Sequence, residues 1–284
     1  MSAIYLILAI FGVFFQSIVQ KQYNKRVSNQ GAYIFNAIAC ISGAFVFAVT
    51  NTDGFDFDLA VLPYSFGFGI GLALAILFIF LAIRDGSMSL TCLLKAYSIL
   101  APTFFGIFFL NELVGWTFWI GLVFLVISIF LINMKKEDAV LSKRWWLYIV
   151  ILFISNGSAS TVQLLQQKKF HGQYRSEFML IAFLISAVIF IVLSILNERK
   201  EVLTYVKKAG FYMVAMGLLL GGANLFLLLT LASGLPSPIV YPVMSGGGII
   251  LATVASVLVY KEKLSWMQVI GLICGVISVV FMNL

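Results

Sequence analysis

The sequence predicts an all-α polytopic membrane protein, with ten transmembrane helices arranged as two inverted five-helix repeats. Of its 284 residues, 62% are hydrophobic and only 10% are charged, and the mean hydropathy is +1.07. A soluble globule of this composition would expose too much apolar surface. Ten apolar segments approach the length of about 20 residues that crosses a bilayer. Finally, residues 112–133 recur in residues 262–283.

Short polar stretches separate the apolar segments. The longest of these connections, near residues 135–144 and 197–208, have room for short interfacial helices at most. The first segment begins at Met1 without a basic n-region or a small-residue cleavage site, so we expect a retained helix and not a signal peptide. The predicted spans are approximately 2–20, 31–50, 63–83, 88–110, 115–133, 145–166, 177–196, 211–231, 237–260 and 266–283.

The repeat is clearest at the end of each half. ELVGWTFWIGLVFLVISIFLIN at 112–133 aligns without gaps with EKLSWMQVIGLICGVISVVFMN at 262–283, with nine identities in 22 positions. These identities include Glu, Trp, Gly and Asn, which are harder to match by chance than aliphatic residues. Each repeat would hold five helices, in residues 1–137 and 138–284. Because five is odd, the second repeat enters the membrane inverted, as in secondary transporters with a site between their halves.

The Lys and Arg residues of the connections predict the orientation. Connections 1-2, 3-4, 5-6, 7-8 and 9-10 carry fourteen of them, and the opposite set carries three. By the positive-inside rule, both termini face away from the cytoplasm, here across the cell inner (plasma) membrane. The repeat-related connections 1-2 and 6-7 are equally basic, so the rule is broken once. Membrane lipid and topology explain the net charge of +7, and we expect no nucleic-acid partner.

Lys95 is the only Lys or Arg well inside a predicted span. An ammonium group there costs about a few kcal/mol unless it is paired or hydrated. It would either project into a water-filled cavity, where it attracts an anionic group, or extend its stem to the headgroups. Helical spacing places Thr91, Cys92 and Ser98 on the same face, which suits a polar lining.

The sixth span carries a narrow polar stripe, which must face protein or water. We expect the stripe either to line one wall of the substrate site or to make hydrogen bonds that hold the helices together. Its counterpart in the first span keeps only Gln16 and Gln20. The stripe comprises Asn156, Ser160, Gln163 and Gln167.

The ninth span opens with Pro236, Pro238, Tyr241 and Pro242 and continues into three glycines at 246–248. This composition predicts the least rigid helix of the chain, with either a hinge or close helix packing as its purpose. Its Ser245 is the repeat mate of Lys95, and the fourth span contains Pro102.

Glu112 and Glu262 stand just before the fifth and tenth spans, where we expect them to cap those helices. Cys40, Cys92 and Cys274 lie singly in apolar segments, and the only histidine, His171, lies in a connection. The sequence therefore indicates no disulfide framework, metal site, cofactor or catalytic residue.

This arrangement resembles the drug/metabolite transporter superfamily, and the EamA-type permeases in particular. In that family, helices 1–4 and 6–9 surround a central cavity and helices 5 and 10 pack outside. The resemblance implies a cavity lined by Lys95, Ser98, Gln16, Gln163, Tyr241 and Ser245, to which the polar stripe adds Asn156. The matching residues are Phe109-Leu110-Asn111-Glu112 to Gly121, Val259-Tyr260-Lys261-Glu262 to Gly271, Leu81-Ala82 and Leu231-Ala232.

The function predicted is secondary active transport of a small polar organic metabolite or drug by alternating access, as a monomer or homodimer. Efflux is favoured, and the wider superfamily's basic sites indicate anionic or zwitterionic substrates. No GxxxxGK loop occurs, so a proton or ion gradient, or exchange, supplies the energy. The alternatives are a membrane-embedded enzyme, for which the spans offer no suitable acid, base or metal ligands, and a passive channel, for which they offer no repeated selectivity element.

Overall fold

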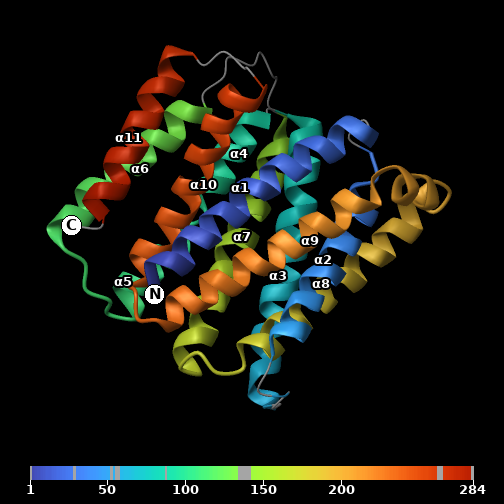
Figure 1. The fold of residues 1–284 in the computed structure, drawn as a ribbon, viewed down its shortest axis with the longest axis horizontal. Helices are drawn as coiled ribbons and strands as arrows, with labels where there is room; N and C mark the ends of the chain where they lie inside the picture. The colour runs from blue at the N-terminus through green and yellow to red at the C-terminus, as the bar shows by residue number, and fades with distance from the viewer. Residues whose placement is uncertain are drawn as a thin grey trace. The chain divides into compact units, whose positions relative to one another are not determined.

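The computed structural model describes residues 2–27, 30–51, 54, 58–86, 88–133, 142–260 and 265–282, and every regular element in these ranges is helical. Eight helical segments are long and apolar enough to cross a membrane, and two shorter apolar helices complete the ten predicted spans (Figure 1). The helices are α1 (Ser2–Val27), α2 (Ala32–Thr50), η1 (Leu59–Val61), α3 (Leu62–Asp85), α4 (Met88–Tyr97), α5 (Leu100–Phe109), α6 (Trp116–Asn133), α7 (Lys143–Lys169), α8 (Arg175–Asn197), α9 (Val202–Ala232), α10 (Ser237–Tyr260) and α11 (Trp266–Met282).

Two elements differ from the prediction. The expected connection at 197–208 is shorter, because α9 already begins at Val202. The fourth span is not one helix but two, α4 and α5, separated at Ser98 and Ile99. By contrast, α10 is continuous through Pro242, so the helix break lies in the fourth span and not in the ninth. Gly246 of α10 instead permits close packing, since a Cβ there would lie 2.5 Å from Leu125 Cδ1.

The chain divides into two compact units, which do not coincide with the sequence repeats. The first unit comprises Met1–Ala73 and Leu165–Ser233, and the second comprises Leu74–Leu164 and Gly234–Leu284. Each unit therefore contains helices from both halves of the sequence, and α3 and α7 contribute to both units. The repeat boundaries at residue 137 remain a prediction from the sequence.

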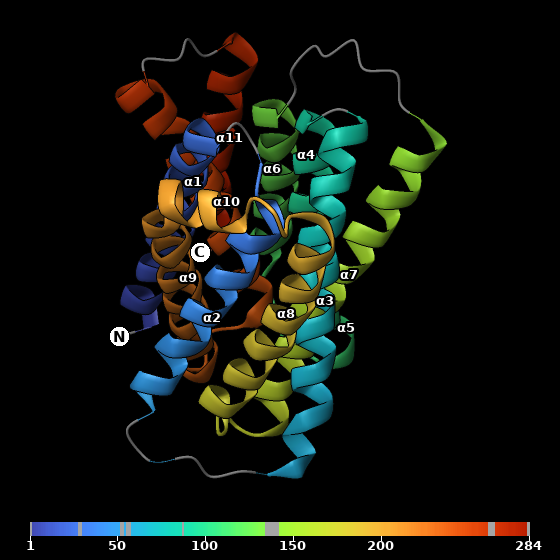
Figure 2. The ribbon, with the colours of Figure 1, turned by 90° about the vertical axis from the view of Figure 1, so that its right-hand side faces the viewer.

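In the first unit, α1 packs on α9, and α2 packs on both α8 and α9 (Figure 2). Small residues bring these backbones together. A Cβ on Gly217 would lie 2.3 Å from the carbonyl oxygen of Ala39, and one on Gly221 would lie 2.9 Å from that of Gly43. Lipid gives helices no hydrophobic reason to associate, so this close approach is a main source of their packing energy.

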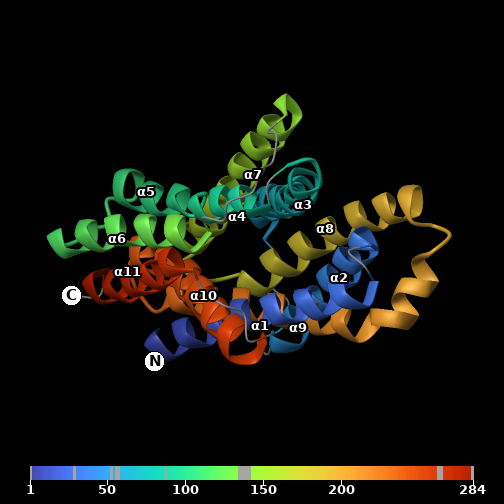
Figure 3. The same ribbon diagram turned by 90° about the horizontal axis from the view of Figure 1, so that it is seen from above.

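In the second unit, the repeat-related helices α6 and α11 pack side by side (Figure 3). Gly121 of α6 lies under Ser278, whose carbonyl oxygen would be 2.9 Å from a Cβ there. Reciprocally, Ser128 of α6 donates a hydrogen bond of 2.7 Å to the carbonyl of Gly271. The sequence repeat equates Gly121 with Gly271 and Ser128 with Ser278, so each half presents the same two positions to the other.

A reciprocal contact of this kind requires a two-fold axis between the two helices. The pairing is also antiparallel, because residues late in α6 meet residues early in α11. The duplicated segments thus run in opposite directions, and the fold is a polytopic membrane protein of ten spans with inverted repeats.

Candidate functional site

Pro102 contributes to the break between α4 and α5. Proline has no N–H, so the carbonyl of Ser98 loses the donor four residues later that a continuous helix would supply. This carbonyl instead accepts a bond of 3.1 Å from the amide of Ala101. The preceding turn tightens in the same way, with the Ser98 amide donating to the Lys95 carbonyl at 3.1 Å.

Helix α7 lies directly against the break. The side-chain amide of Asn156 donates to the hydroxyl of Ser98 at 2.6 Å, and that hydroxyl donates to the carbonyl of Lys95, also at 2.6 Å. Gly157 permits the approach, since a Cβ there would lie 2.9 Å from the Cβ of Ala101. A chain of two hydrogen bonds therefore joins α7 to the backbone of Lys95.

Lys95 occupies the last turn of α4, and its side chain is exposed. In the part of the chain that the structure describes, no carboxylate pairs with its ammonium group. An unpaired ammonium within an apolar span has a strong electrostatic preference for an anionic ligand. The charge and position of Lys95 are thus compatible with the recognition of an anion.

Three further predicted site residues, Tyr241, Gln163 and Ser245, belong to the same unit. Tyr241 of α10 is fully buried, and its hydroxyl donates to the carbonyl of Ser160 in α7 at 3.1 Å. Gln163 of α7 is also buried, while Ser245 of α10 is half-buried. In the polar stripe of α7, the side chain of Asn156 thus makes an interhelical hydrogen bond, as one of the two interpretations of the sequence proposed, whereas the hydroxyl of Ser160 donates within α7 to the carbonyl of Asn156 at 3.1 Å.

Gln16 belongs to the first unit, unlike the other six predicted site residues. Its side-chain amide donates to the carbonyl of Leu219 in α9 at 3.3 Å, and the side chain is half-buried. Its part in a substrate site stays a prediction.

Glu112 caps a different helix from the one expected from the sequence. Its carboxylate accepts from the amide and the hydroxyl of Ser237, at 2.8 and 2.5 Å, and so caps the start of α10. Gly106 leaves room for this pairing, because a Cβ there would lie 2.4 Å from the Ser237 hydroxyl. Spacing along the chain pointed to the nearest helix, whereas the cap bridges 125 positions. Its repeat mate Glu262 lies outside the described residues.

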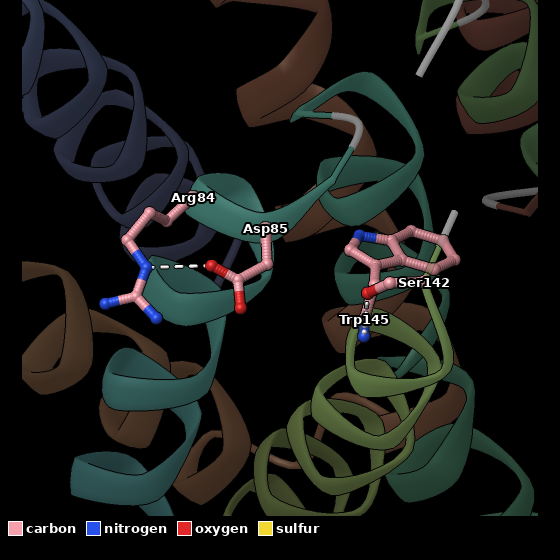
Figure 4. A network of polar contacts seen from close by, with 4 residues as sticks. All are labelled: Arg84, Asp85, Ser142 and Trp145. Atoms are coloured by element: carbon pink, nitrogen blue, oxygen red, sulfur yellow. Dashed lines mark hydrogen bonds and ion pairs between the residues drawn. The ribbon is translucent and has the colours of Figure 1, made fainter. Parts of the chain in front are cut away.

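The beginnings of α4 and α7 are held together by a tryptophan that the sequence analysis did not single out. The amide of Trp145 donates to the hydroxyl of Ser142, which caps α7 (Figure 4). In the same view, Arg84 pairs with Asp85 at the end of α3. The indole N–H of Trp145 donates to Thr91 in α4 at 3.2 Å. Since Thr91 lies one turn before Lys95, this contact helps to fix the helix that carries the lysine.

The fold and the ionic group within a span define a polytopic membrane protein with inverted repeats, the architecture of many secondary transporters. The family model of the EamA-like transporter family matches residues 144–284. A curated relative, the "Uncharacterized membrane protein YvaE" of Bacillus subtilis (strain 168), is 37% identical over 100 residues, which are 34% of this chain and 83% of the relative. The chain belongs to the EamA-like transporter family, as the sequence predicted.

A solved crystal structure is similar over nearly the whole chain. Its TM-score is 0.76 at 13% sequence identity, and the match covers 98% of this chain and 96% of the other. At this identity the likeness supports the fold alone.

Proposed function

We propose that the protein is a secondary active transporter that exports a small polar organic solute with an anionic or zwitterionic group across the plasma membrane. Membership of a family of transporters supports the general class. The observation that carries the substrate class is the ammonium group of Lys95 within a span, which no described carboxylate neutralises.

The electrostatics of Lys95 favour an anionic group over a neutral one. A lone ammonium within a span is costly, and an arriving carboxylate or phosphate offsets that cost through a charge-assisted hydrogen bond. The amides of Asn156 and Gln163 and the hydroxyl of Ser245 lie in the same unit and suit the uncharged polar part of a solute. Gln16 and Tyr241 remain predicted contacts.

The interrupted fourth span supports a transport site at this depth. In secondary transporters, substrates bind near the bilayer midplane beside discontinuous helices, where backbone groups are freed from the regular helical pattern. Here the break lies three residues beyond Lys95. We propose that alternating access uses the two inverted repeats as the moving parts, driven by an ion gradient or by exchange.

Ligand-dependent thermal stability tests the role of Lys95. The purified protein is screened against amino acids, dicarboxylates and sugar phosphates, and compared with Lys95→Met. We expect an anionic or zwitterionic solute to raise the melting temperature of the wild type and to have no effect on the variant. The melting temperature without ligand stays unchanged or rises, because an uncompensated charge is removed.

Lys143→Met is the matched control, since Lys143 is an exposed lysine of the same unit at the start of α7. It should keep the full response to the solute. If Lys95→Met also keeps it, Lys95 takes no part in recognition.

Flux into proteoliposomes separates the functional classes. Saturable uptake that is accelerated by solute on the opposite side identifies a carrier. A linear, unsaturable flux would identify a channel, and chemical conversion of the solute would identify an enzyme.

A further inference from the structure

One end of the first unit concentrates positive charge. Antiparallel packing brings the last turns of α1 next to the corner between α8 and α9, as shown by the guanidinium of Arg26, which lies 5.3 Å from the ring centroid of Tyr212. Tyr23 and Ala209 share a hydrophobic cluster at the same place. We call the seven basic residues here the basic end: Lys21, Lys25, Arg26, Arg199, Lys200, Lys207 and Lys208.

Among the described residues of this end, the carboxylates of Glu198 and Glu201 already make contacts that stabilise the fold. Glu198 caps α2 by accepting from the amides of Tyr33 and Ile34, at 3.1 and 2.9 Å. Glu201 accepts from the hydroxyl of Tyr205. Even if both carboxylates are counted in full, Arg26, Arg199, Lys200, Lys207 and Lys208 alone give five cations against two anions among the described residues of this end, and this excess of positive charge favours an external anion.

Helix length places the basic end at the level of the lipid headgroups. Helix α9 has 31 residues and is therefore about 46 Å long, whereas about 20 residues suffice to cross the hydrocarbon. Roughly its first ten residues then extend beyond the hydrocarbon. Large apolar side chains are exposed beside the cations, with Leu203 at 65% and Phe211 at 79%, which suits the boundary between headgroups and acyl chains.

The opposite end of the same unit is nearly balanced. Among its described residues, Lys168, Lys169 and Arg175 stand against Asp58 and Glu177. The ammonium of Lys169 lies over the ring of Tyr64, 5.3 Å from its centroid. The unit is therefore electrically polarised along its helices.

We propose that the basic end binds the phosphate headgroup of an anionic phospholipid and thereby holds this end of the unit in the anionic leaflet. The cations at headgroup depth meet the phosphodiester, and the exposed apolar side chains beside them meet the upper acyl chains. This inference does not depend on the transported solute. A free phosphate would satisfy the charges but not the apolar neighbours, so the occupant is a lipid.

Thermal stability in the presence of added lipid tests this site. The full chain in neutral detergent is titrated with phosphatidylglycerol or with phosphatidylcholine. We expect only phosphatidylglycerol to raise the melting temperature, with an effect that weakens as salt is added. In Lys207→Gln/Lys208→Gln, the apparent affinity for phosphatidylglycerol should fall by roughly 30-fold at low salt, from the loss of two cations near an anionic surface.

Lys168→Gln/Lys169→Gln is the matched control, because it removes an adjacent lysine pair from the other end of the unit. Its response to phosphatidylglycerol should equal that of the wild type. Equal losses in both variants would overturn the site, as would equal stabilisation of the wild type by phosphatidylcholine. Stabilisation by inorganic phosphate to the same extent would identify a general anion site and overturn the lipid assignment. The lipid and phosphate comparisons use the wild type, so they decide the question even if a variant folds poorly.

Discussion

Ser98 shows how one small side chain stabilises an interruption in a membrane span. Its hydroxyl is buried, and it both accepts from Asn156 and donates to the carbonyl of Lys95. In hydrocarbon, polar groups freed by a helix break need protein partners. The hydroxyl satisfies one such carbonyl and ties it to a neighbouring helix, so the lysine is positioned from two directions.

A double-mutant cycle measures this tie. Ser98→Ala and Asn156→Ala should each lower stability, and the coupling free energy between them should be about 0.6 to 1.7 kcal/mol, the range for hydrogen bonds between membrane helices. Unfolding in mixed micelles provides the free energies. Ser158→Ala is the control on α7, since Ser158 is exposed and bonds only to the carbonyl of Ser155. The effects of Ser158→Ala and Ser98→Ala on stability should simply add. A coupling free energy between Ser98 and Ser158 as large as that between Ser98 and Asn156 would show that the cycle measures a general destabilisation and not one hydrogen bond.

For single residues, the composition of the spans identified the ammonium group of Lys95 but not the residues that surround it. Lys95 could be identified because a cation within an apolar span has a high free-energy cost. Trp145 and the pairing of Glu112 with Ser237 could not, because partners 54 and 125 positions away leave no periodic signal. Repeat alignment related equivalent positions but not the pairs in contact.

Among the elements, the two prolines of repeat-related spans have different consequences. Pro102 coincides with a break, whereas α10 continues through Pro242. The backbone at Ser98 is additionally held by Asn156 and by the tight approach of Gly157. Proline alone therefore does not determine the interruption. The sequence marked both spans by their prolines but did not show which of them is interrupted.

Pro102→Ala tests the origin of the break. The new amide supplies the donor that the Ser98 carbonyl lacks, so α4 and α5 should join into one helix with unchanged or higher thermal stability. Hydrogen exchange of the amides at 98–103 should slow, and the initial transport rate should fall several-fold if the break is needed for function. Pro242→Ala, in a helix already continuous, should leave exchange in α10 nearly unchanged. Rapid exchange at 98–103 that persists in Pro102→Ala would assign the break to the contacts with α7.

The start of α9 was missed for a physical reason. A hydropathy window ends where lysines begin, but a helix continues as long as its backbone groups are paired. Residues 202–208 keep helical pairing while their cations extend into water or headgroups. Helix boundaries and membrane boundaries are therefore different quantities, and the sequence gives the second more reliably.

For the whole molecule, the sequence predicted the number of spans and the inversion, because length, hydropathy and duplication determine both. It did not predict the division into compact units, which mix the two halves. That division depends on which faces of the helices pack, and apolar faces that contact lipid and protein have similar compositions. The orientation in the membrane rests on charge and is open to a direct test.

Cysteine labelling determines the orientation. The variant lacks the native cysteines. Gly54→Cys lies at an exposed position after α2, and Thr204→Cys lies at the exposed start of α9 near the basic end. With external termini, an impermeant maleimide should modify Gly54→Cys in intact cells and Thr204→Cys only after permeabilisation. The reverse pattern would place the termini in the cytoplasm.

The reciprocal contact between α6 and α11, which we call the seam, has a consequence for how the duplicated chain arose. Two copies of a single five-helix chain, inserted in opposite directions, would form the same self-complementary seam without any new residue, since each would offer its own glycine to the other's serine. The curated relative matches over 83% of its length with only 100 residues, so it is shorter than half of this chain. Fusion of two copies of that five-helix chain would then have fixed a pairing that their antiparallel association had already made possible.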